Sequence, residues 1–510
     1  MSTGGRVPHP EREIARDIDD LAHDLEYERR VLDESIRHDY SSSASGIVPL
    51  DRRRPIWHFA GLWLTLQAGY GGLFVGYELH DGGHTLLATF GITMLAIGIY
   101  FGYAMLAAYL GSRTGQTHAL LTRSIFGISG SWLISAILVV GGLGWVGFQA
   151  NLLSQIFDGL YGWGHVLLIG IILAAAMIFN NLFGFTGITV FARYIVTPLM
   201  VLWILYLLIK GLTTESSSFL GAHPKNANGI TLWFAIGAVL GFLTWGDEPD
   251  FWRYGRPKFW WPAPGYLFGL IFGQLLFTLG GWIMAQLAPG QSFGGSVRLI
   301  AHYSLFGWFW LAFALAVLGQ FAANDGNYYI SINGLQNILA GLRGWKRVYT
   351  CLLLAGGAAF SGWLIPHTTN GWFKVASFLA ATIPAATIIM AVDHFLLPRL
   401  FRINRPLTQV PAWKDAAFIN VPALVALVPS VLVGTIGSGV FPGLGDQYWY
   451  LPALEGWVLA ATLYIAGVAV ARNLPNIKKV LGFKRDLLRA EIPPSRTPID
   501  IVTAAKATQA

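Results

Sequence analysis

The chain has 510 residues, of which 54% are hydrophobic and 12% charged, and its formal net charge is +7. Soluble domains carry about 25% charged residues, so this composition excludes an ordinary soluble protein. The positive charge does not indicate nucleic-acid binding, because the basic residues gather at the ends of long apolar stretches. We interpret them as the topology signals of a membrane protein.

Apolar stretches recur from about residue 56 to residue 472, and each approaches the roughly 20 residues that a helix needs to cross a bilayer core. Backbone amides that face lipid must bond within their own segment, so these stretches are expected to be helices. The sequence therefore predicts an all-α polytopic membrane protein with about twelve transmembrane helices. The predicted spans are 56-78, 85-110, 131-157, 164-184, 191-212, 228-247, 264-288, 304-336, 347-366, 373-392, 416-436 and 448-471.

This pattern divides the chain into a cytoplasmic segment (1-55), a ten-helix transport core (56-392), two additional helices (393-471) and a cytoplasmic tail (472-510). Loops rich in Lys and Arg alternate with loops poor in them, which places both termini in the cytoplasm. The expected location is the plasma membrane, which in a bacterium is the inner membrane. Within 1-55 an apolar stripe predicts a partly ordered helix, and the tail carries a basic patch suited to anionic lipid heads.

Several classes of function lack their sequence signals. The single cysteine, Cys351, allows no disulfide framework, and the 12 histidines are scattered rather than paired at metal-binding spacing. No glycine loop followed by Lys and Ser or Thr suggests ATP binding. A channel would need a symmetric ring of charges or carbonyls, and no such pattern is found. We expect no metal, no cofactor and no enzymatic activity.

Spans one to five and six to ten are expected to form an inverted repeat. Span one is interrupted near its centre by Gly69, Gly71 and Gly72, and span six by Gly237 and Gly241. Glycine-interrupted segments in corresponding positions of two halves indicate a midplane binding site in transporters.

Trp145 and Gln149 are four residues apart in span three, so they project from one helix face. An aromatic plane beside an amide that both donates and accepts suits a flat, hydrogen-bonding ring. A packing tryptophan with an interhelical hydrogen bond would give the same pattern, and the spacing alone does not separate the two interpretations.

Span eight holds a polar sequence, Phe321-Ala-Ala-Asn-Asp-Gly-Asn-Tyr-Tyr329, after a wholly apolar run. A carboxylate at this depth costs about 2.5 to 3.5 kcal/mol and is normally kept for a substrate, an ion or a proton relay. Asp325 is therefore a candidate to accept an N–H from a ligand or to exchange a proton.

The end of span six contains Glu248, Asp250 and Arg253 on the predicted cytoplasmic side. The spacing of Asp250 and Arg253 permits an ion pair on one helical turn. We expect this helix end to help close the inner gate, and Glu248 and Asp250 are further candidates for proton binding.

Four motifs together resemble the nucleobase-cation symporter family, which includes cytosine, purine, allantoin and hydantoin permeases, and the resemblance covers about residues 55 to 440. The motifs are Gly111-Ser-Arg-Thr-Gly115 with Ser124-Ile-Phe-Gly127 in the loop after span two, Gly144-Trp-Val-Gly-Phe-Gln149, Pro249-Asp-Phe-Trp-Arg-Tyr254 and Ala323-Asn-Asp-Gly-Asn-Tyr-Tyr329.

The resemblance implies a LeuT-type fold, a 5+5 inverted repeat followed by two C-terminal helices. A bundle of spans one, two, six and seven would rock against a scaffold of spans three, four, eight and nine. It also implies that Trp145 stacks on a substrate ring, while Gln149 and the span-eight pair Asn324 and Asp325 bond the ring's edge.

For span six the resemblance implies an aromatic contact at Phe242, with Ala238 as its neighbour. Gln67 of span one is a further candidate for a polar contact. The expected partners are a purine, pyrimidine or related ring and the lipid bilayer, with no nucleic acid.

One departure from the family concerns the coupling ion. Sodium-coupled members place hydroxyl side chains just before the span-eight Asn, where this chain has Ala322 and Ala323. Two oxygen ligands are therefore missing, which favours coupling to protons over sodium.

The sequence thus predicts a secondary active transporter, a symporter that imports a nucleobase or related small heterocycle by alternating access, with proton coupling favoured. A sodium-coupled transporter for hydantoin, allantoin or a vitamin ring is the first alternative. An amino-acid transporter of the same fold is the second, disfavoured because Trp145 and Gln149 suit a neutral planar ring.

Overall fold

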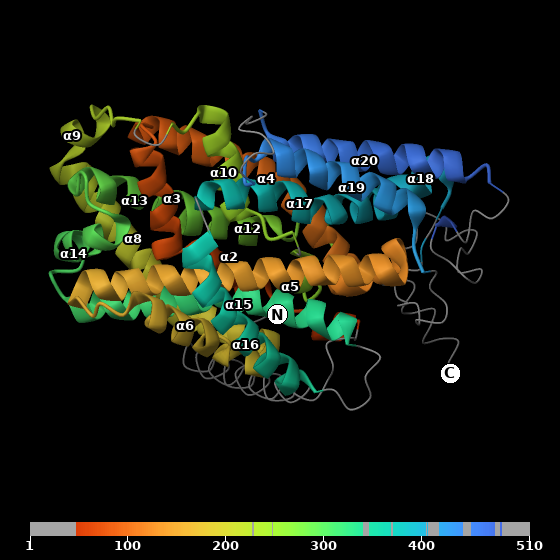
Figure 1. The fold of residues 1–510 in the computed structure, drawn as a ribbon, viewed down its shortest axis with the longest axis horizontal. Coiled ribbons are helices and arrows are strands. Elements are labelled where there is room, and N and C mark those ends of the chain that lie inside the picture. The colour runs from red at the N-terminus through yellow and green to blue at the C-terminus, as the bar shows by residue number, and fades with distance from the viewer. Residues whose placement is uncertain are drawn as a thin grey trace, which may run out of the picture.

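The computed structural model describes residues 47–474 except 227–228, 247, 340–345, 369–370, 404, 406–417 and 442–449, together with residues 480 and 481. The described chain is almost entirely helical (Figure 1). The predicted N-terminal helix and the basic patch of the C-terminal tail both lie outside the described residues.

The first half of the chain forms the helices up to the end of the fifth predicted span. They are η1 (Leu50–Arg52), α2 (Ile56–Gln67), α3 (Tyr70–Asp81), α4 (Leu86–Thr114), α5 (His118–Tyr161), α6 (Val166–Ala176), η2 (Phe179–Phe183), α7 (Gly184–Phe191), η3 (Ala192–Val196), α8 (Thr197–Thr214) and α9 (Ser216–Leu220).

The second half begins with the sixth predicted span and ends with a pair of helices. Its elements are α10 (Leu232–Leu243), α11 (Glu248–Trp252), α12 (Ala263–Phe268), η4 (Gly269–Leu275), α13 (Leu276–Leu287), α14 (Phe293–Ser304), α15 (Phe309–Ile338), α16 (Arg347–Thr368), α17 (Trp372–Ala391), η5 (Val392–Leu396), α18 (Leu397–Phe401), α19 (Val421–Gly437) and α20 (Pro452–Ala471).

Within the described residues, seven helices or joined helices are long and apolar enough to cross a membrane, or eight when a bent pair is counted as one span. Others fall short of that length because they are broken, as α2 and α3 are, or short, as α19 is. The mostly helical, multi-span architecture is confirmed, and the count of twelve spans stays a prediction.

Threonine side chains fix where several helices begin. Thr85, Thr117 and Thr231 each accept a hydrogen bond from the backbone N–H three residues later, at 3.2, 3.2 and 3.3 Å. Such caps satisfy N–H groups that have no partner inside the helix. The local sequence thus determines where α4, α5 and α10 begin.

Span one is broken at the expected glycine. The chain leaves helical geometry between α2 and α3, where Gly69 has φ +93°, a conformation that favours glycine. Span six breaks elsewhere than expected, at Thr244 to Gly246, and Gly246 has φ +82°.

Gly237 and Gly241 do not interrupt span six but lie inside α10. Gly241 is needed for packing, because a Cβ atom there would collide with the backbone carbonyl of Ala376 in α17. The glycine that interrupts a helix and the glycine that admits a neighbouring backbone look alike in a sequence.

Two helix boundaries also differ from the sequence prediction. The predicted loop containing Ser124 to Gly127 is helical, because α5 starts at His118 and kinks at Gly127, where φ is +78°. The predicted span 304-336 corresponds to α15 from Phe309, and it is preceded by α14, which bends from α15 by 116°.

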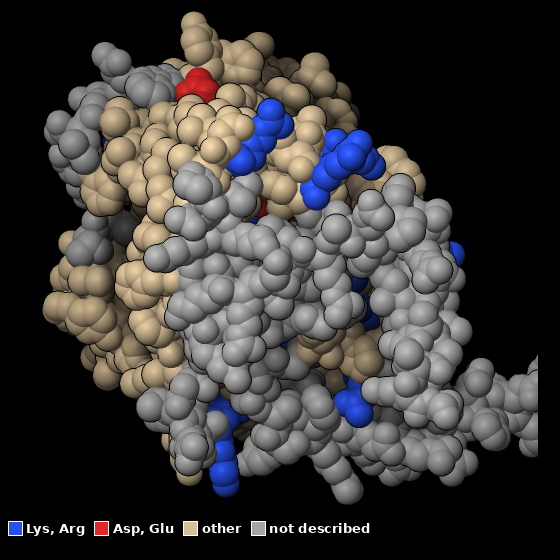
Figure 2. All heavy atoms as spheres, turned by 90° about the vertical axis from the view of Figure 1, so that its right-hand side faces the viewer, with Lys and Arg blue, Asp and Glu red and all other residues tan. Residues whose placement is uncertain are grey.

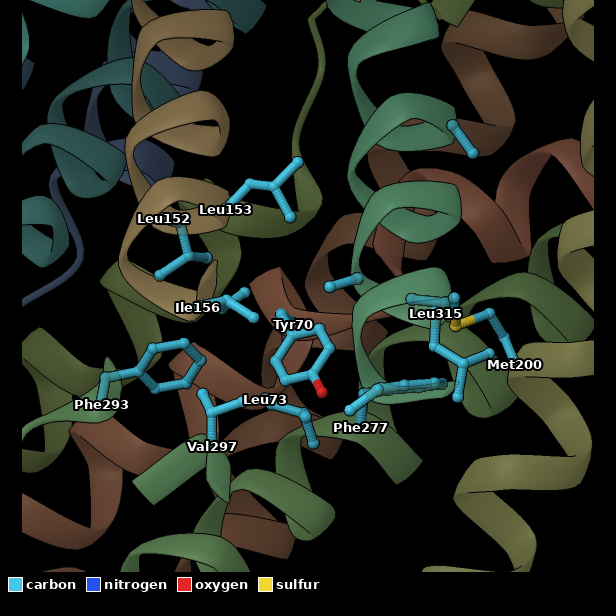
Figure 3. Close-up of a cluster of buried hydrophobic side chains, with 14 of the residues drawn as sticks. Tyr70, Leu73, Leu152, Leu153, Ile156, Met200, Phe277, Phe293, Val297 and Leu315 are labelled. Carbon is cyan, nitrogen blue, oxygen red and sulfur yellow. The ribbon is translucent and has the colours of Figure 1, made fainter. Parts of the chain in front are cut away.

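Glycines let α3 and α13 pack backbone to backbone. A Cβ atom at Gly76 would collide with the carbonyl oxygen of Thr278, and one at Gly281 with that of Leu73. Around this contact lies a large apolar core, in which Tyr70 and Leu73 of α3 meet Phe277 of α13 and side chains of α5, α8, α14 and α15 (Figure 3).

The two helices after the core, α19 and α20, lie side by side and pack against α17 (Figure 1). A buried charge cluster fixes this end of the molecule. Arg405 donates to Asp393 at 2.6 Å, and the hydroxyl of Tyr464 in α20 donates to the other oxygen of Asp393 at 2.5 Å.

Candidate functional site

A cavity lies where the breaks of spans one and six face α5 and α15. The empty space between its lining atoms, including the part open to solvent, is about 600 Å³. Its lining includes Gln67, Gly71, Trp145, Gln149, Phe242, Trp245, Gln274, Ala323 and Asn327. Four of the predicted substrate-contacting residues, Gln67, Trp145, Gln149 and Phe242, are therefore brought together.

Aromatic rings form one wall of the cavity. The rings of Trp145 and Phe242 lie 5.2 Å apart and meet edge to face at 65°. Behind them, Trp372 at the start of α17 stacks on Trp145 at 5.8 Å and lies 4.1 Å from Phe148. Stacking faces of this kind bind flat rings.

Two amide side chains supply unpaired acceptors at the cavity. Among the described residues, Oε1 of Gln149 and Oδ1 of Asn327 are buried and have no hydrogen-bond partner. The Nδ2 group of Asn327 donates to Asn324 at 2.9 Å, which fixes its orientation. Buried acceptors without a partner in the protein are rare, so these two oxygens are candidates to accept hydrogen bonds from a bound ligand.

The position of Gln149 depends on the glycine break of span one. A Cβ atom at Gly71 would lie 3.2 Å from Nε2 and 3.3 Å from Oε1 of Gln149. Glycine at this position therefore lets the α3 backbone approach the amide closely.

Gln67 ties the two broken spans together. Its amide lies 3.0 Å from both the indole Nε1 of Trp245 and Oε1 of Gln274, and the orientation with the oxygen towards the indole satisfies both contacts. Because its hydrogen bonds are taken by the protein, Gln67 shapes the cavity wall more than it offers a free contact to a ligand.

Asn324 and Asp325 do not line the cavity, contrary to the expected substrate contacts. Nδ2 of Asn324 lies 2.7 Å from the sulfur of Met177. The carboxylate of Asp325 accepts from Asn180 at 3.0 Å and from Asn181 at 3.4 Å. Both side chains thus face the end of α6 and η2.

The register of α15 explains this difference. Successive residues of a helix are turned by about 100°, so residues four apart share a face. Ala323 and Asn327 share the face towards the cavity, and Asn324 and Asp325 are turned away. The span-eight polar residue at the cavity is Asn327.

Glu248 closes the break of span six. Its carboxylate accepts from the hydroxyls of Tyr100 and Tyr103 in α4, at 3.1 and 2.8 Å. It also accepts from the backbone N–H groups of Trp245 and Gly246, each at 3.3 Å. Glu248 is completely buried and joins span two to the unwound stretch beside the cavity.

Asp250 forms a second junction at the same end of the molecule. It accepts from the backbone N–H of His118 at 2.6 Å and from Nδ2 of Asn333 in α15 at 3.1 Å. Arg253 donates to the hydroxyl of Tyr329 at 3.0 Å. These contacts link this helix end to α5 and α15, and its role in closing the inner gate stays a prediction.

Residues missed by sequence reasoning include Asn327, Trp245 and Gln274. Asn327 stands four residues after Ala323 within a motif that the sequence already marked, so the helical period was the available signal. Trp245 and Gln274 carry no such signal, because their role depends on where span six breaks and on how span seven packs.

Known proteins share both the sequence pattern and the fold. No protein-family model matches the chain. The cytosine permease of Escherichia coli (strain K12) is 24% identical over 444 residues, which cover 84% of this chain and 98% of the permease. The cytosine permease of Escherichia coli O157:H7 matches to the same extent.

Among solved structures, the chain is similar to Mhp1, a nucleobase-cation-symport-1 family transporter, in a closed conformation with bromovinylhydantoin bound. The TM-score is 0.69, with 17% identity and coverage of 86% of this chain and 97% of Mhp1. The inward-facing conformation of Mhp1 gives a TM-score of 0.64, with 16% identity and coverage of 84% and 94%. A Na+-coupled sialic acid symporter gives 0.56, with 12% identity and coverage of 87% and 96%.

The chain has a LeuT-like fold with several apolar helices, as a multi-pass membrane protein has, and the relatives it matches are transporters and not enzymes. The resemblance to the nucleobase-cation symporter family, first inferred from four sequence motifs, is confirmed by the permease relatives and the Mhp1 structures.

Proposed function

We propose that the protein is a secondary transporter that imports a small planar heterocycle, a nucleobase or a related ring such as a hydantoin, by alternating access. The observation that carries this proposal is an aromatic wall, Trp145 and Phe242, beside two unpaired buried oxygens, on Gln149 and Asn327. The cytosine named for the permeases and the hydantoin named for the Mhp1 structure belong to this class of ring.

The chemistry of the lining selects for ring N–H groups. A ring packed against the aromatic wall formed by Trp145 and Phe242 would donate one N–H to Oε1 of Gln149 and another to Oδ1 of Asn327. A ring without these donors would leave each buried acceptor unpaired, which costs about 1–3 kcal/mol per group. Stacking and two or three hydrogen bonds suit an affinity near micromolar, roughly −8 kcal/mol.

Proton coupling is part of the proposal. Ala322 and Ala323 supply no side-chain oxygen for sodium. Among the three candidate carboxyls, Glu248 is the best placed, because it binds the backbone of Trp245, a cavity residue. Asp325 faces away from the cavity. Asp250 lies further along α11, where it bonds residues of α5 and α15 that do not line the cavity. We therefore propose Glu248 as the first candidate for the carboxyl group that carries the coupled proton.

The distribution of charged side chains indicates how the protein is oriented in the membrane. On the end of the molecule at the right of Figure 1, the described surface shows basic side chains and little acid (Figure 2). By the positive-inside rule this end faces the cytoplasm. We propose about twelve spans with both termini on that side, in a plasma membrane or bacterial inner membrane.

A ligand screen on the purified full-length chain tests the proposed function. The panel is adenine, guanine, hypoxanthine, cytosine, uracil, allantoin, hydantoin and pyridoxine, each with and without sodium, and the readout is the thermal unfolding temperature. A ligand that binds only the folded state must raise this temperature. At least one ring is expected to do so without sodium, and Gln149→Ala should abolish the shift.

Other outcomes of the screen count against parts of the proposal. A shift that appears only with sodium would refute proton coupling and leave the ring class standing. If no ring shifts the unfolding temperature while amino acids do, the proposed substrate class is wrong.

A further inference from the structure

A groove with an arginine in its wall lies at the cytoplasmic ends of spans one, five and seven. Its lining residues differ from those of the substrate cavity. Its lining is Trp57, Ala60 and Gly61 of α2, Arg193 and Thr197 of the η3–α8 junction, and Phe268 of α12. None of these residues lines the substrate cavity.

Close backbone packing builds the floor of the groove. A Cβ atom at Gly61 would lie 3.1 Å from Cα of Arg193, and the hydroxyl of Thr197 donates to the carbonyl of Gly61 at 3.2 Å. The contact occurs where span five is π-helical, from Ala192 to Val196. Single π-turns inside α-helices are frequent at functional sites.

Positive charge is concentrated at this groove. Nη1 of Arg193 lies 3.0 Å from Nε2 of His58, and Arg54 and Arg193 are both close enough to act electrostatically on that imidazole. Arg54 is held by a 3.0 Å hydrogen bond to Thr186. Within the described parts of the chain, no carboxylate lies within ion-pair distance of Arg193.

The groove also has the character of a membrane interface. Trp57 is 65% exposed and Tyr194 is 55% exposed, and these residue types gather at the level of lipid headgroups. The guanidinium of Arg193 lies 4.8 Å from the ring centroid of Tyr194. An arginine at the level of the lipid headgroups attracts anionic lipids, and no carboxylate of the described residues competes for Arg193.

We propose that the phosphate of an anionic membrane lipid binds Arg193 in this groove, with Arg54 as a second cation and an acyl chain lying over Ala60, Gly61 and Phe268. The planar guanidinium offers paired N–H donors that match phosphate oxygens. His58 accepts one N–H of Arg193 and thereby holds the guanidinium in place. This inference does not depend on the identity of the transported solute.

The test measures lipid binding to the purified full-length chain in a neutral detergent. Phosphatidylglycerol and phosphatidylcholine are titrated while native mass spectrometry follows the bound lipid. The variants are Arg193→Gln, Arg193→Lys and Arg54→Gln, and Arg256→Gln removes an exposed charge at the same end of the molecule as a matched control.

Phosphatidylglycerol is expected to bind more tightly than phosphatidylcholine. Arg193→Gln should weaken its binding about fivefold, the effect of one basic residue near an anionic headgroup, while Arg193→Lys and Arg256→Gln should weaken it less. If Arg193→Gln does not fold, a similar loss of phosphatidylglycerol binding in Arg54→Gln would support the proposal in its place.

Equal binding of phosphatidylglycerol by the wild type, Arg193→Gln and Arg54→Gln would overturn the proposal. Inorganic phosphate alone is a further probe, read as a rise in the thermal unfolding temperature. A rise that depends on Arg193 and that phosphatidylglycerol does not exceed would assign the groove to a free anion and overturn the assignment to lipid.

Discussion

Tyr103 of α4 donates a 2.8 Å hydrogen bond to Glu248, the first residue of α11. The same carboxylate holds the backbone of Trp245 and Gly246 at the break of span six. A change in the proton or hydrogen-bond state of Glu248 therefore reaches a cavity residue through one hydrogen bond. This is the physical link that we propose between proton binding and the substrate.

Replacing Glu248 by Gln should uncouple transport from the proton gradient. In proteoliposomes, uptake by the wild type should rise as the outside is made more acidic, because protonation of the carrier group is then favoured. Glu248→Gln cannot exchange a proton, so its uptake should no longer respond to the proton gradient, while exchange of labelled for unlabelled substrate continues.

Asp325→Asn serves as the comparison for that experiment. It should keep the response to the proton gradient, because Asp325 bonds Asn180 and Asn181 on the far side of α15. If Asp325→Asn loses the response and Glu248→Gln keeps it, the group that carries the coupled proton is Asp325 and not Glu248.

Gly281→Ala should destabilise the contact between α3 and α13. The added methyl group would collide with the carbonyl oxygen of Leu73, and overpacking of this kind costs about 1–3 kcal/mol. The expected result is a lower thermal unfolding temperature in detergent. Gly98→Ala is the control, because a Cβ atom there meets nothing within 4 Å, and it should leave the temperature unchanged or raise it.

Arg405→Met should destabilise the junction between the core and α20. Among the described residues it leaves the buried carboxylate of Asp393 with Tyr464 as its remaining side-chain hydrogen-bond partner, and breaking a buried ion pair costs about 3–5 kcal/mol. Thermal unfolding would measure the loss. The exposed Arg399→Met should have little effect, and the double variant Asp393→Asn with Arg405→Met should recover part of the loss, since no charge is then stranded.

The sequence predicted the helical architecture because composition and span length are strong physical constraints in a bilayer. It also placed Trp145 and Gln149 on one face, since the helical period alone decides that relationship. The break at Gly69 followed from glycine in an otherwise apolar helix.

Tertiary packing decided the features that the sequence did not predict. Nothing local distinguishes Gly241, which admits the backbone of Ala376, from Gly246, which lies in the break. Likewise, the motif around Asn324 and Asn327 contains polar side chains on several faces of α15. The neighbours of α15 determine which of these faces meets the cavity.

The most direct test of the account is the equilibrium dissociation constant of the best ring from the ligand screen, measured for the wild type, Asn327→Ala and Asn324→Ala. Asn327→Ala should weaken binding at least about tenfold, equivalent to roughly 1.4 kcal/mol, because it removes an acceptor at the cavity. Asn324→Ala should weaken binding less than Asn327→Ala does, because it removes the group that orients Asn327 and leaves the acceptor itself in place. Unchanged binding in Asn327→Ala, or a larger loss in Asn324→Ala than in Asn327→Ala, would contradict the proposed site.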